Sequence, residues 1–299
     1  MSKNFQKIYN KSIENPEEFW KNNSEDIFWF KKPTKILNKS NHPFYKWYED
    51  GVTNTCYNAL DVHIDKGDGE KIALIYDSPI TGNKSKHTYK ELKEKVSKFA
   101  GALFNQGVNK GDRVIIYMPM IPEAVVAMLA CARIGAIHSV VFGGFASNEL
   151  ASRIDDSKAK VLVTASCGFE PGRTVEYKPL VDGAIKQANH KIDKMILFQR
   201  SGHEVKLNAP KEVSWDEVVS NAEEIDCVEM KSNDFAYILY TSGTTGTPKG
   251  IVRDIGGHIV ALKWTMKNIY NIDAGDIWWS ASDIGWIVGH SYIVYAPLF

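Results

Sequence analysis

Short apolar runs separated by helical patterns make up most of the chain from residue 72 onward. Apolar runs with little alternation are typical of strands buried on both faces, as in a parallel sheet. The predicted strands lie at residues 72–78, 113–118, 137–142, 161–166, 195–198 and 235–240. Strands that alternate with helices indicate βαβ units, so we expect an α/β fold with parallel sheets and helices on both faces.

Two of the intervening helices have clear boundary signals. Thr88 and Glu91 have the spacing of a capping box, and apolar residues at positions 92, 96, 99 and 103 recur at helical spacing until Gly107. Pro119 and Pro122 precede a second, buried helix that we expect to continue through Arg133. Near the end of the chain, positions 259, 262, 266 and 269 are apolar and share one face of a predicted helix, with lysines at 263 and 267 on the other.

Four other segments lack this alternation. Residues 28–30 (FWF) and 44–48 (FYKWY) are rich in aromatic rings, which we expect to lie along the main body as an extension. Residues 199–210 indicate a flexible connection between two subdomains. The apolar residues 291–299 (SYIVYAPLF) predict either a docked terminal strand or helix or a chain that stops inside a domain, and we favour the second interpretation.

Composition and charge exclude several classes of protein. The chain has 299 residues, of which 44% are hydrophobic and 24% are charged, as in soluble globular proteins. Lys+Arg and Asp+Glu number 36 each, so no overall charge favours nucleic acid or an anionic membrane. The longest charge-free apolar run, residues 124–132, is far shorter than the roughly 20 residues of a membrane span.

Neither the N-terminus nor the cysteines indicate export or a metal centre. The first 20 residues have no apolar core and no arginine, so we expect no signal or transit peptide and a cytoplasmic location. The cysteines, at positions 56, 131, 167 and 227, form no C-x-x-C pair. We therefore expect reduced core thiols, and neither a structural zinc nor any metal-ligand residue.

The segment TSGTTGTPKG, residues 241–250, has the strongest chemical signal in the chain. It follows the apolar run FAYILY directly, and a glycine-rich loop that leaves a buried strand can direct its backbone N–H groups toward an anion. Its five hydroxyl residues add donors, and Lys249 adds a compact positive charge for terminal phosphates. The segment lacks the G-K-[ST] ending of the common P-loop. We interpret it as a phosphate-binding loop; a mobile surface loop is the alternative.

These residues together resemble the acyl-adenylate-forming superfamily and, within it, the short-chain acyl-CoA synthetases. Residues 241–250 resemble the signature of the superfamily, and residues 40–64 are similar to the N-terminal extension of acetyl- and propionyl-CoA synthetases. Residues 117–146 and 282–298 resemble further blocks of these enzymes, and residues 149–180 look closer to propionate-CoA ligases. The resemblance implies an N-terminal extension over residues 1–70 and an AMP-binding domain over residues 71–299, incomplete at its C-terminus.

The implied reaction is the ATP-dependent, AMP-forming conversion of a short-chain carboxylate to its acyl-CoA, with Mg²⁺ as cofactor. The resemblance makes Lys249 and Thr244 catalytic residues and assigns the remaining phosphate contacts to Thr241, Ser242, Gly243, Thr245 and Gly246. FGGF (Phe142, Gly143, Gly144 and Phe145) matches the stretch that meets the pantetheine arm of coenzyme A. EPGR (Glu170, Pro171, Gly172 and Arg173) matches the loop that meets its nucleotide, although without the family context Arg173 would be one more surface arginine and FGGF a plain turn.

The segment GWIVG, residues 285–289, resembles the acyl pocket of these enzymes. Trp286, Ile287 and Val288 are then expected to surround the tail of the carboxylate, and ordinary core packing is the less favoured alternative for Ile287. Relatives that use acetate commonly have threonine at the position of Val288, so the resemblance favours propionate over acetate. Asp283 and His290 flank the segment and receive no catalytic role.

The later elements of the family, including the lysine of its mobile C-terminal domain, are not found in these residues. We therefore expect the 299-residue chain to have little or no ligase activity by itself. Two alternatives remain: a truncated module that binds nucleotide and coenzyme A without catalysis, and an unrelated kinase-like nucleotide binder. The last would require the loop to lead into a helix N-terminus at Gly250 with no sheet neighbours.

Overall fold

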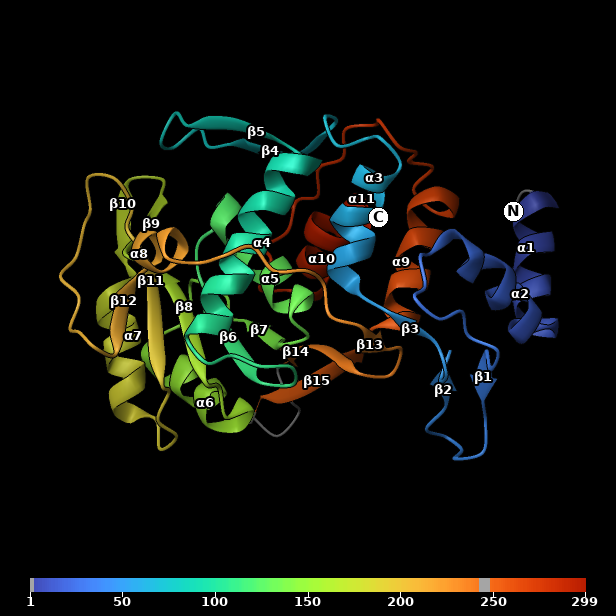
Figure 1. Ribbon diagram of the computed structural model, residues 1–299, viewed down its shortest axis with the longest axis horizontal. Coiled ribbons are helices and arrows are strands. Elements are labelled where there is room, and N and C mark those ends of the chain that lie inside the picture. Colours follow the sequence, from blue (N-terminus) through green and yellow to red (C-terminus); the bar gives the residue numbers. More distant parts are fainter. Residues whose placement is uncertain (1–2, 242–247) are drawn as a thin grey trace.

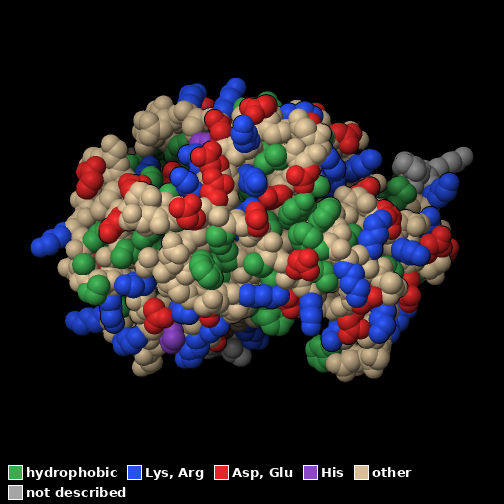
Figure 2. Space-filling view, in the orientation of Figure 1, with side chains coloured by type: hydrophobic (Ala, Val, Ile, Leu, Met, Phe, Trp, Pro, Cys, Tyr) green, Lys and Arg blue, Asp and Glu red, His purple; other side chains and the backbone are tan. Residues whose placement is uncertain are grey.

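The computed structural model describes residues 3–241 and 248–299 of the chain (Figure 1). Within these two ranges, no helix combines the length and the apolar character needed to cross a bilayer. Basic and acidic side chains are interspersed over the face shown in Figure 2, as the equal numbers of the two kinds suggest.

A seven-stranded sheet forms the centre of the molecule, in the order β12-β11-β8-β6-β7-β14-β15. Its strands are β6 (Arg113–Tyr117), β7 (Ile137–Val140), β8 (Val161–Ala165), β11 (Lys194–Phe198), β12 (Glu212–Ser214), β14 (Phe235–Thr241) and β15 (Lys249–Asp254). Neighbours from β12 to β14 are parallel, whereas β14 and β15 are antiparallel. The predicted parallel α/β sheet is confirmed, and the antiparallel edge strand β15 was not predicted.

Helices cover both faces of this sheet (Figure 1). On one face lie α4 (Tyr89–Asn105) and α5 (Pro122–Arg133), and on the other lie α6 (Ser147–Ser157) and α7 (Tyr177–Gln187). Successive side chains of β6 enter the two cores in turn: Val114 and Ile116 belong to the first and Ile115 and Tyr117 to the second. Burial on both faces explains why these strands are almost entirely apolar.

The two helices with boundary signals are confirmed. Helix α4 begins after Thr88, whose Oγ1 accepts a hydrogen bond from the Glu91 N–H at 3.1 Å. The Glu91 carboxylate in turn accepts from the Thr88 N–H at 2.8 Å, which completes the capping box. Helix α5 starts at Pro122 and is buried from Ala124 to Arg133.

The prediction that residues 72–78 belong to the parallel sheet is wrong. They form β4 (Ile72–Asp77), which pairs with β5 (Lys84–Thr88) in a separate antiparallel hairpin. Only residues 78–83 join the two strands, and a parallel crossover needs a dozen or more residues. In Figure 1 the hairpin lies apart from the main sheet, next to the start of α4.

The prediction that residues 199–210 connect two subdomains is also wrong. These residues lie between β11 and β12, which are parallel neighbours in the same sheet. The short helix α8 (Trp215–Ser220) follows β12 and packs against α4, with the Trp215 ring stacked on Phe99 at 3.6 Å between centroids.

The N-terminal residues pack along one end of the main body. Helices α1 (Lys3–Glu14) and α2 (Pro16–Asn23) come first, and Phe19 and Trp20 of α2 each lie 5.8 Å from the Trp264 ring of α9 (Gly256–Asn268). The chain continues through the β1 (Leu37–Asn38) and β2 (Lys46–Trp47) ladder, and β3 (Val52–Thr53) pairs with β13 (Met230–Lys231). A π-helical turn (Tyr57–Asp61) and α3 (Val62–Asp65) then lead to the hairpin.

The predicted face of the last long helix is largely confirmed. Ile259, Leu262 and Met266 of α9 are buried, but Ile269 lies beyond the helix end and is exposed. The chain ends in short helical segments: α10 (Ile287–Gly289), the π-helical η3 (His290–Tyr295) and α11 (Ala296–Leu298). Ring nitrogen Nε2 of His63 lies 2.7 Å from the Leu298 carbonyl oxygen, so the last helical segment contacts α3.

Candidate functional site

Three of the four segments with predicted chemistry leave strands at one edge of the sheet. FGGF follows β7, the EPGR segment follows β8, and the glycine-rich segment follows β14. β7 is parallel to β14 and to β6, and β6 is parallel to β8. The carboxyl ends of β7, β8 and β14 therefore lie at the same edge of the sheet. Ligands of open α/β sheets bind at this edge.

The glycine-rich segment connects two antiparallel strands. Thr241, the last residue of β14, is the register partner of Lys249, the first residue of β15, and Tyr240 is the partner of Gly250. Thr241 and Lys249 are exposed. Ser242, Gly243, Thr244, Thr245 and Gly246, to which we assigned phosphate contacts, lie outside the described residues. The segment leads into a strand and not into a helix, which removes the condition set for the kinase-like alternative.

An arginine connects the base of this hairpin to the FGGF turn. The Arg153 guanidinium of α6 lies 5.4 Å from the Tyr240 ring and 4.7 Å from the Phe145 ring. Glu149 holds it with a carboxylate oxygen at 2.9 Å. The Tyr240 hydroxyl donates to Asp156 at 2.6 Å; burial and this acceptor raise the pKa of Tyr240 above its ordinary value. Tyr240, the residue before Thr241, is therefore held both at its ring and at its hydroxyl.

The FGGF turn is tightly held. The Phe145 N–H donates to the Phe142 carbonyl at 3.0 Å, and the Tyr117 hydroxyl lies 2.7 Å from the Phe145 carbonyl oxygen and 3.1 Å from that of Gly143. A Cβ on Gly143 would lie 2.1 Å from the Tyr177 hydroxyl oxygen, and one on Gly144 would lie 2.5 Å from the Phe142 ring. The packing of neighbouring rings thus already requires both glycines.

The predicted acyl-pocket segment packs against this turn. The Trp286 ring lies 5.6 Å from Phe142 and 6.1 Å from Phe145, and a Cβ on Gly285 would lie 2.8 Å from the Phe142 Cα. Trp286, Ile287 and Val288 are 46%, 42% and 47% exposed. Ile287 therefore does not belong to the core. The structure also brings the predicted acyl-pocket segment and the FGGF turn together, although they are far apart in the sequence.

The EPGR segment is the tip of a small hairpin. Strands β9 (Cys167–Glu170) and β10 (Arg173–Glu176) flank Pro171 and Gly172, and Gly172 has a φ of +75°. Arg173 is exposed, and its Nη2 and Nε lie 2.6 and 2.7 Å from the same Glu170 carboxylate oxygen. An exposed ion pair contributes little stability, so Arg173 can exchange Glu170 for another anion at small cost.

Tyr177 joins the EPGR hairpin to the FGGF turn. Its hydroxyl oxygen, which faces Gly143, would lie 3.0 Å from a Cβ on Gly168 of β9. Burial raises the pKa of Tyr177 well above its ordinary value, so the hydroxyl stays protonated. One tyrosine therefore fixes the spacing of the two segments assigned to coenzyme A.

Two family models match the chain. Residues 62–299 match the model described as "AMP-binding enzyme". The chain belongs to this family. Residues 5–59 match "Acetyl-coenzyme A synthetase N-terminus". The resemblance inferred from the motifs is confirmed at this level.

Similar proteins carry related names. The chain is 55% identical to "Acyl-CoA synthetase short-chain family member 3, mitochondrial" of Homo sapiens, a match that covers 96% of this chain and 42% of the relative. It is 45% identical to "Propionate--CoA ligase" of Escherichia coli (strain K12), covering 98% of the chain and 47% of the relative. It is 43% identical to "Acetyl-coenzyme A synthetase" of Xanthobacter autotrophicus, covering 98% and 46%. The chain thus spans less than half the length of these relatives.

Several residues that shape the candidate site were not found from the sequence. Tyr117, Arg153 and Tyr177 hold the FGGF turn and its surroundings, and the Met120 sulfur lies 3.4 Å from the Ile284 nitrogen beside the acyl-pocket segment. Only Tyr117 carried a signal, because a tyrosine at the end of a fully buried strand needs a partner for its hydroxyl.

Two of the four cysteines, Cys56 and Cys227, lie close together in the folded chain. Within the described residues, one group of potential metal ligands comes together: Cys56, Asp61 and Cys227, whose ligand atoms all lie within 4.8 Å of one another. Arg133 occupies the centre, with Nη1 2.8 Å from an Asp61 oxygen, 3.1 Å from the Cys227 sulfur and 3.6 Å from the Cys56 sulfur. The guanidinium supplies the positive charge that a metal would otherwise bring, so this group does not fit Mg²⁺ or zinc.

Proposed function

We propose that the complete protein carrying these residues is an ATP-dependent, AMP-forming short-chain acyl-CoA synthetase. The observation that carries the proposal is the packing of Trp286 against Phe142, because it sets the candidate acyl and coenzyme A segments side by side at the carboxyl edge of the sheet. The family and the names of the relatives support the same reaction.

The reaction has two balanced steps. A carboxylate oxygen attacks the α-phosphorus of ATP, the bond to the bridging oxygen breaks, and pyrophosphate leaves as the acyl-adenylate forms. The thiolate of coenzyme A then attacks the acyl carbon, and the carbon–oxygen bond to AMP breaks. The protein mainly positions the reactants and stabilises charge.

The roles of the residues follow from their positions. Lys249, at the exposed start of β15 opposite Thr241, would neutralise the departing pyrophosphate, with Thr244 and the remaining loop residues around the phosphates. Mg²⁺, when bound, would supply further charge neutralisation at the phosphates. The FGGF turn and the EPGR hairpin would receive the two ends of coenzyme A.

We further propose that propionate is preferred to acetate. Val288 is half-exposed beside Trp286 and offers a methyl group where a threonine would offer a hydroxyl. One methylene of substrate is worth only about 1–3 kcal/mol of discrimination, so the preference is moderate. Because the 299 residues span less than half of the relatives' length, we also propose that they give little or no turnover alone.

The function is tested by separating the two half-reactions in the complete protein. Lys249→Ala should slow pyrophosphate exchange, which reports adenylate formation, by about 10²-fold or more, and should leave thioester formation from supplied acyl-adenylate nearly unchanged. Lys267→Ala, which removes an exposed lysine of α9, is the control and should change neither rate. Equal losses in both half-reactions would count against the role of Lys249, and no acyl-CoA from any short carboxylate would refute the function.

A further inference from the structure

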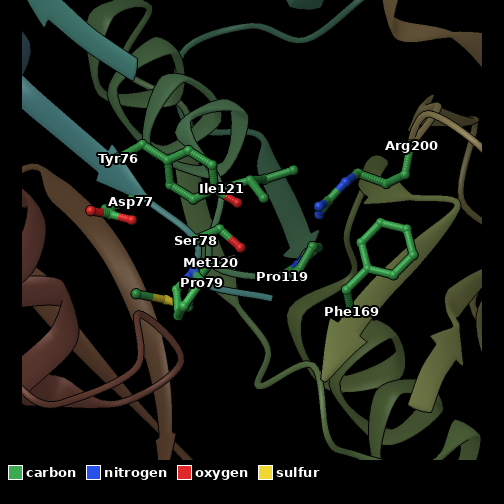
Figure 3. Close-up of a pocket in the computed structure, with 9 residues that line it drawn as sticks. All are labelled: Tyr76, Asp77, Ser78, Pro79, Pro119, Met120, Ile121, Phe169 and Arg200. Carbon is green, nitrogen blue, oxygen red and sulfur yellow. The ribbon is translucent and has the colours of Figure 1, made fainter. Parts of the chain in front are cut away.

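A pocket of about 230 Å³ lies at the carboxyl edge of the sheet, apart from the candidate acyl segment. One wall is Pro119, Met120 and Ile121, which follow β6, and another is residues 76–79 at the end of β4. The third wall is Phe169 of β9 and Arg200, which follows β11. Figure 3 shows Tyr76 and Arg200 extending toward each other from opposite sides of this space.

Arg200 differs from the other buried arginines of the structure. Arg133, Arg153 and Arg200 are 0%, 5% and 8% exposed. Two Asp61 oxygens hold Arg133 at 2.8 and 3.1 Å, and a Glu149 oxygen holds Arg153 at 2.9 Å. In the part of the chain that the structure describes, no carboxylate lies within 4.0 Å of the Arg200 guanidinium and no group accepts a hydrogen bond from it.

Arg200 is held in place by a backbone hydrogen bond and a ring contact, and neither supplies an oxygen acceptor to its guanidinium. Its backbone N–H donates to the Ser166 hydroxyl at 2.8 Å, and its guanidinium lies 4.9 Å from the centre of the Phe169 ring. A guanidinium stays protonated in proteins, and a ring face accepts none of its five N–H groups in the way an oxygen does. The Arg200 guanidinium nitrogens remain accessible through the pocket that they line, so an anion that enters the pocket can pair with them.

The charges around the pocket limit the kind of anion. Asp77 is engaged with Lys84 at 2.8 Å, so the mouth carries a neutral pair. Glu123, at the start of α5, is half-buried, and burial raises its pKa while the Arg200 charge opposes that shift. With one unpaired positive charge, the pocket matches a monoanion better than the dianion of a phosphate ester.

The lining indicates the rest of the ligand. The guanidinium fork matches a carboxylate with two parallel hydrogen bonds. Pro119, Met120 and Ile121 present apolar atoms to a short hydrocarbon body. The Ser78 hydroxyl accepts from the Thr81 N–H at 3.3 Å, which leaves its own proton to donate. From this geometry we propose that the pocket is a binding site for a small organic monocarboxylate, held by Arg200.

This site is separate from the one where the proposed reaction would occur. Met120 stands between the pocket and the acyl-pocket segment, with its sulfur 3.4 Å from the Ile284 nitrogen. Met120 also contacts Ile284 beside the predicted acyl pocket, but none of the described residues that line the pocket was assigned a chemical step in the proposed ligase reaction. The proposal therefore stands on the buried, unpaired arginine and does not depend on the ligase activity.

The experiment is a titration of the complete protein with butyrate, followed by carboxylate-observed NMR and by a crystal soak. The variants are Arg200→Met, which removes the charge at similar length, and Arg200→Lys, which keeps the charge without the fork. Lys206→Met is the matched control, because Lys206 is an exposed cation of the same connection. Trp286→Ala reports the candidate acyl pocket and separates binding there from binding at Arg200.

We expect Arg200→Met to weaken butyrate binding at this pocket by about tenfold to a hundredfold. Arg200→Lys should be intermediate, and Lys206→Met and Trp286→Ala should leave this binding unchanged, with butyrate density at Arg200 in the soaked crystal. Binding that is lost in Trp286→Ala and kept in Arg200→Met would overturn the proposal, as would the absence of butyrate at Arg200.

A second readout does not depend on the ligand. Replacing an unpaired buried charge with an apolar side chain of similar volume should not lower the unfolding temperature. A large fall in that temperature for Arg200→Met would show that the guanidinium already has a partner in the complete protein and would contradict the site. A protein that makes no acyl-CoA but binds butyrate at Arg200 would refute the proposed function alone.

Discussion

Val288 is the single side chain on which the proposed acyl preference depends. Replacing it with threonine adds a hydroxyl at the same volume in a half-exposed position. We expect Val288→Thr to shift the propionate-to-acetate ratio of kcat/KM toward acetate by about threefold to tenfold. Val252→Thr makes the same change at an exposed valine of β15 and should leave the ratio unchanged. An unaltered ratio in Val288→Thr would remove Val288 from the acyl pocket.

At the residue scale, the neighbouring Tyr177 is enough to explain why position 143 requires a glycine, and no ligand is needed for that explanation. An alanine Cβ there would lie 2.1 Å from the hydroxyl oxygen of the buried Tyr177. We expect Gly143→Ala to lower the free energy of unfolding by about 1–3 kcal/mol, measured by denaturant titration. Tyr177→Phe in the same chain removes the clashing oxygen and should recover part of the loss. Additive losses in the double variant would show that this contact is not the cause.

At the scale of the element, helix α4 depends on its first turn. The capping box of Thr88 and Glu91 satisfies two N–H groups that would otherwise have no partner in the helix. We expect Thr88→Ala to lower the free energy of unfolding by about 1 kcal/mol. Thr88→Ser keeps the capping oxygen and is the control. Equal losses for alanine and serine would mean that the methyl group of Thr88, and not its cap, stabilises the helix.

Strands that are buried on both faces of the sheet were predicted correctly from the sequence, whereas the partly exposed strand β4 was not. The runs that became β6, β7, β8 and β11 are apolar because both faces of the sheet are covered. Residues 72–78 carry a similar run, but β4 is partly exposed along its length and pairs with the polar β5. Local composition does not distinguish these cases, since the partner strand decides them.

At the scale of the whole molecule, three buried histidines, His138, His258 and His290, surround the Tyr237 ring next to the predicted acyl-pocket segment. The rings of His138 and His290 are 5.3 Å apart, and those of Tyr237 and His258 are also 5.3 Å apart. Burial lowers the pKa of His258 from 6.5 to about 3 and that of His290 to about 4, and it lowers the pKa of His138 well below 6.5. The folded protein therefore holds these rings neutral.

This cluster predicts a loss of stability in mild acid. The folded pKa values are lower than the unfolded value, so the unfolded chain binds more protons below pH 6.5. Stability should be complete above that pH and should fall as the pH drops from 6.5 toward about 4, by up to about 1.4 kcal/mol per pH unit for each histidine. Denaturant titrations between pH 7 and pH 4.5 measure the slope.

His290→Leu should make that slope shallower by about one proton. Neither ring nitrogen of His290 makes a hydrogen bond of regular geometry with a described residue, although the backbone of Trp286 and of Ile284 opposes the lowering of its pKa, so the apolar replacement removes only these weak contacts. Replacing the exposed His42 with glutamine should leave the slope unchanged. A slope that is the same in His290→Leu and in the parent protein would contradict the account.

The sequence by itself determined the class of fold, the capped helix α4, the family and the segments that carry the candidate chemistry. These properties depend on local pattern: apolar period, cap spacing and a run of glycine, hydroxyl and lysine residues. Tertiary structure alone decided that Trp286 lies on Phe142, that Tyr177 requires Gly143, and that Arg200 is buried without a carboxylate. Each of these features depends on segments that are far apart in the sequence, and no periodicity along the chain encodes which segments become neighbours.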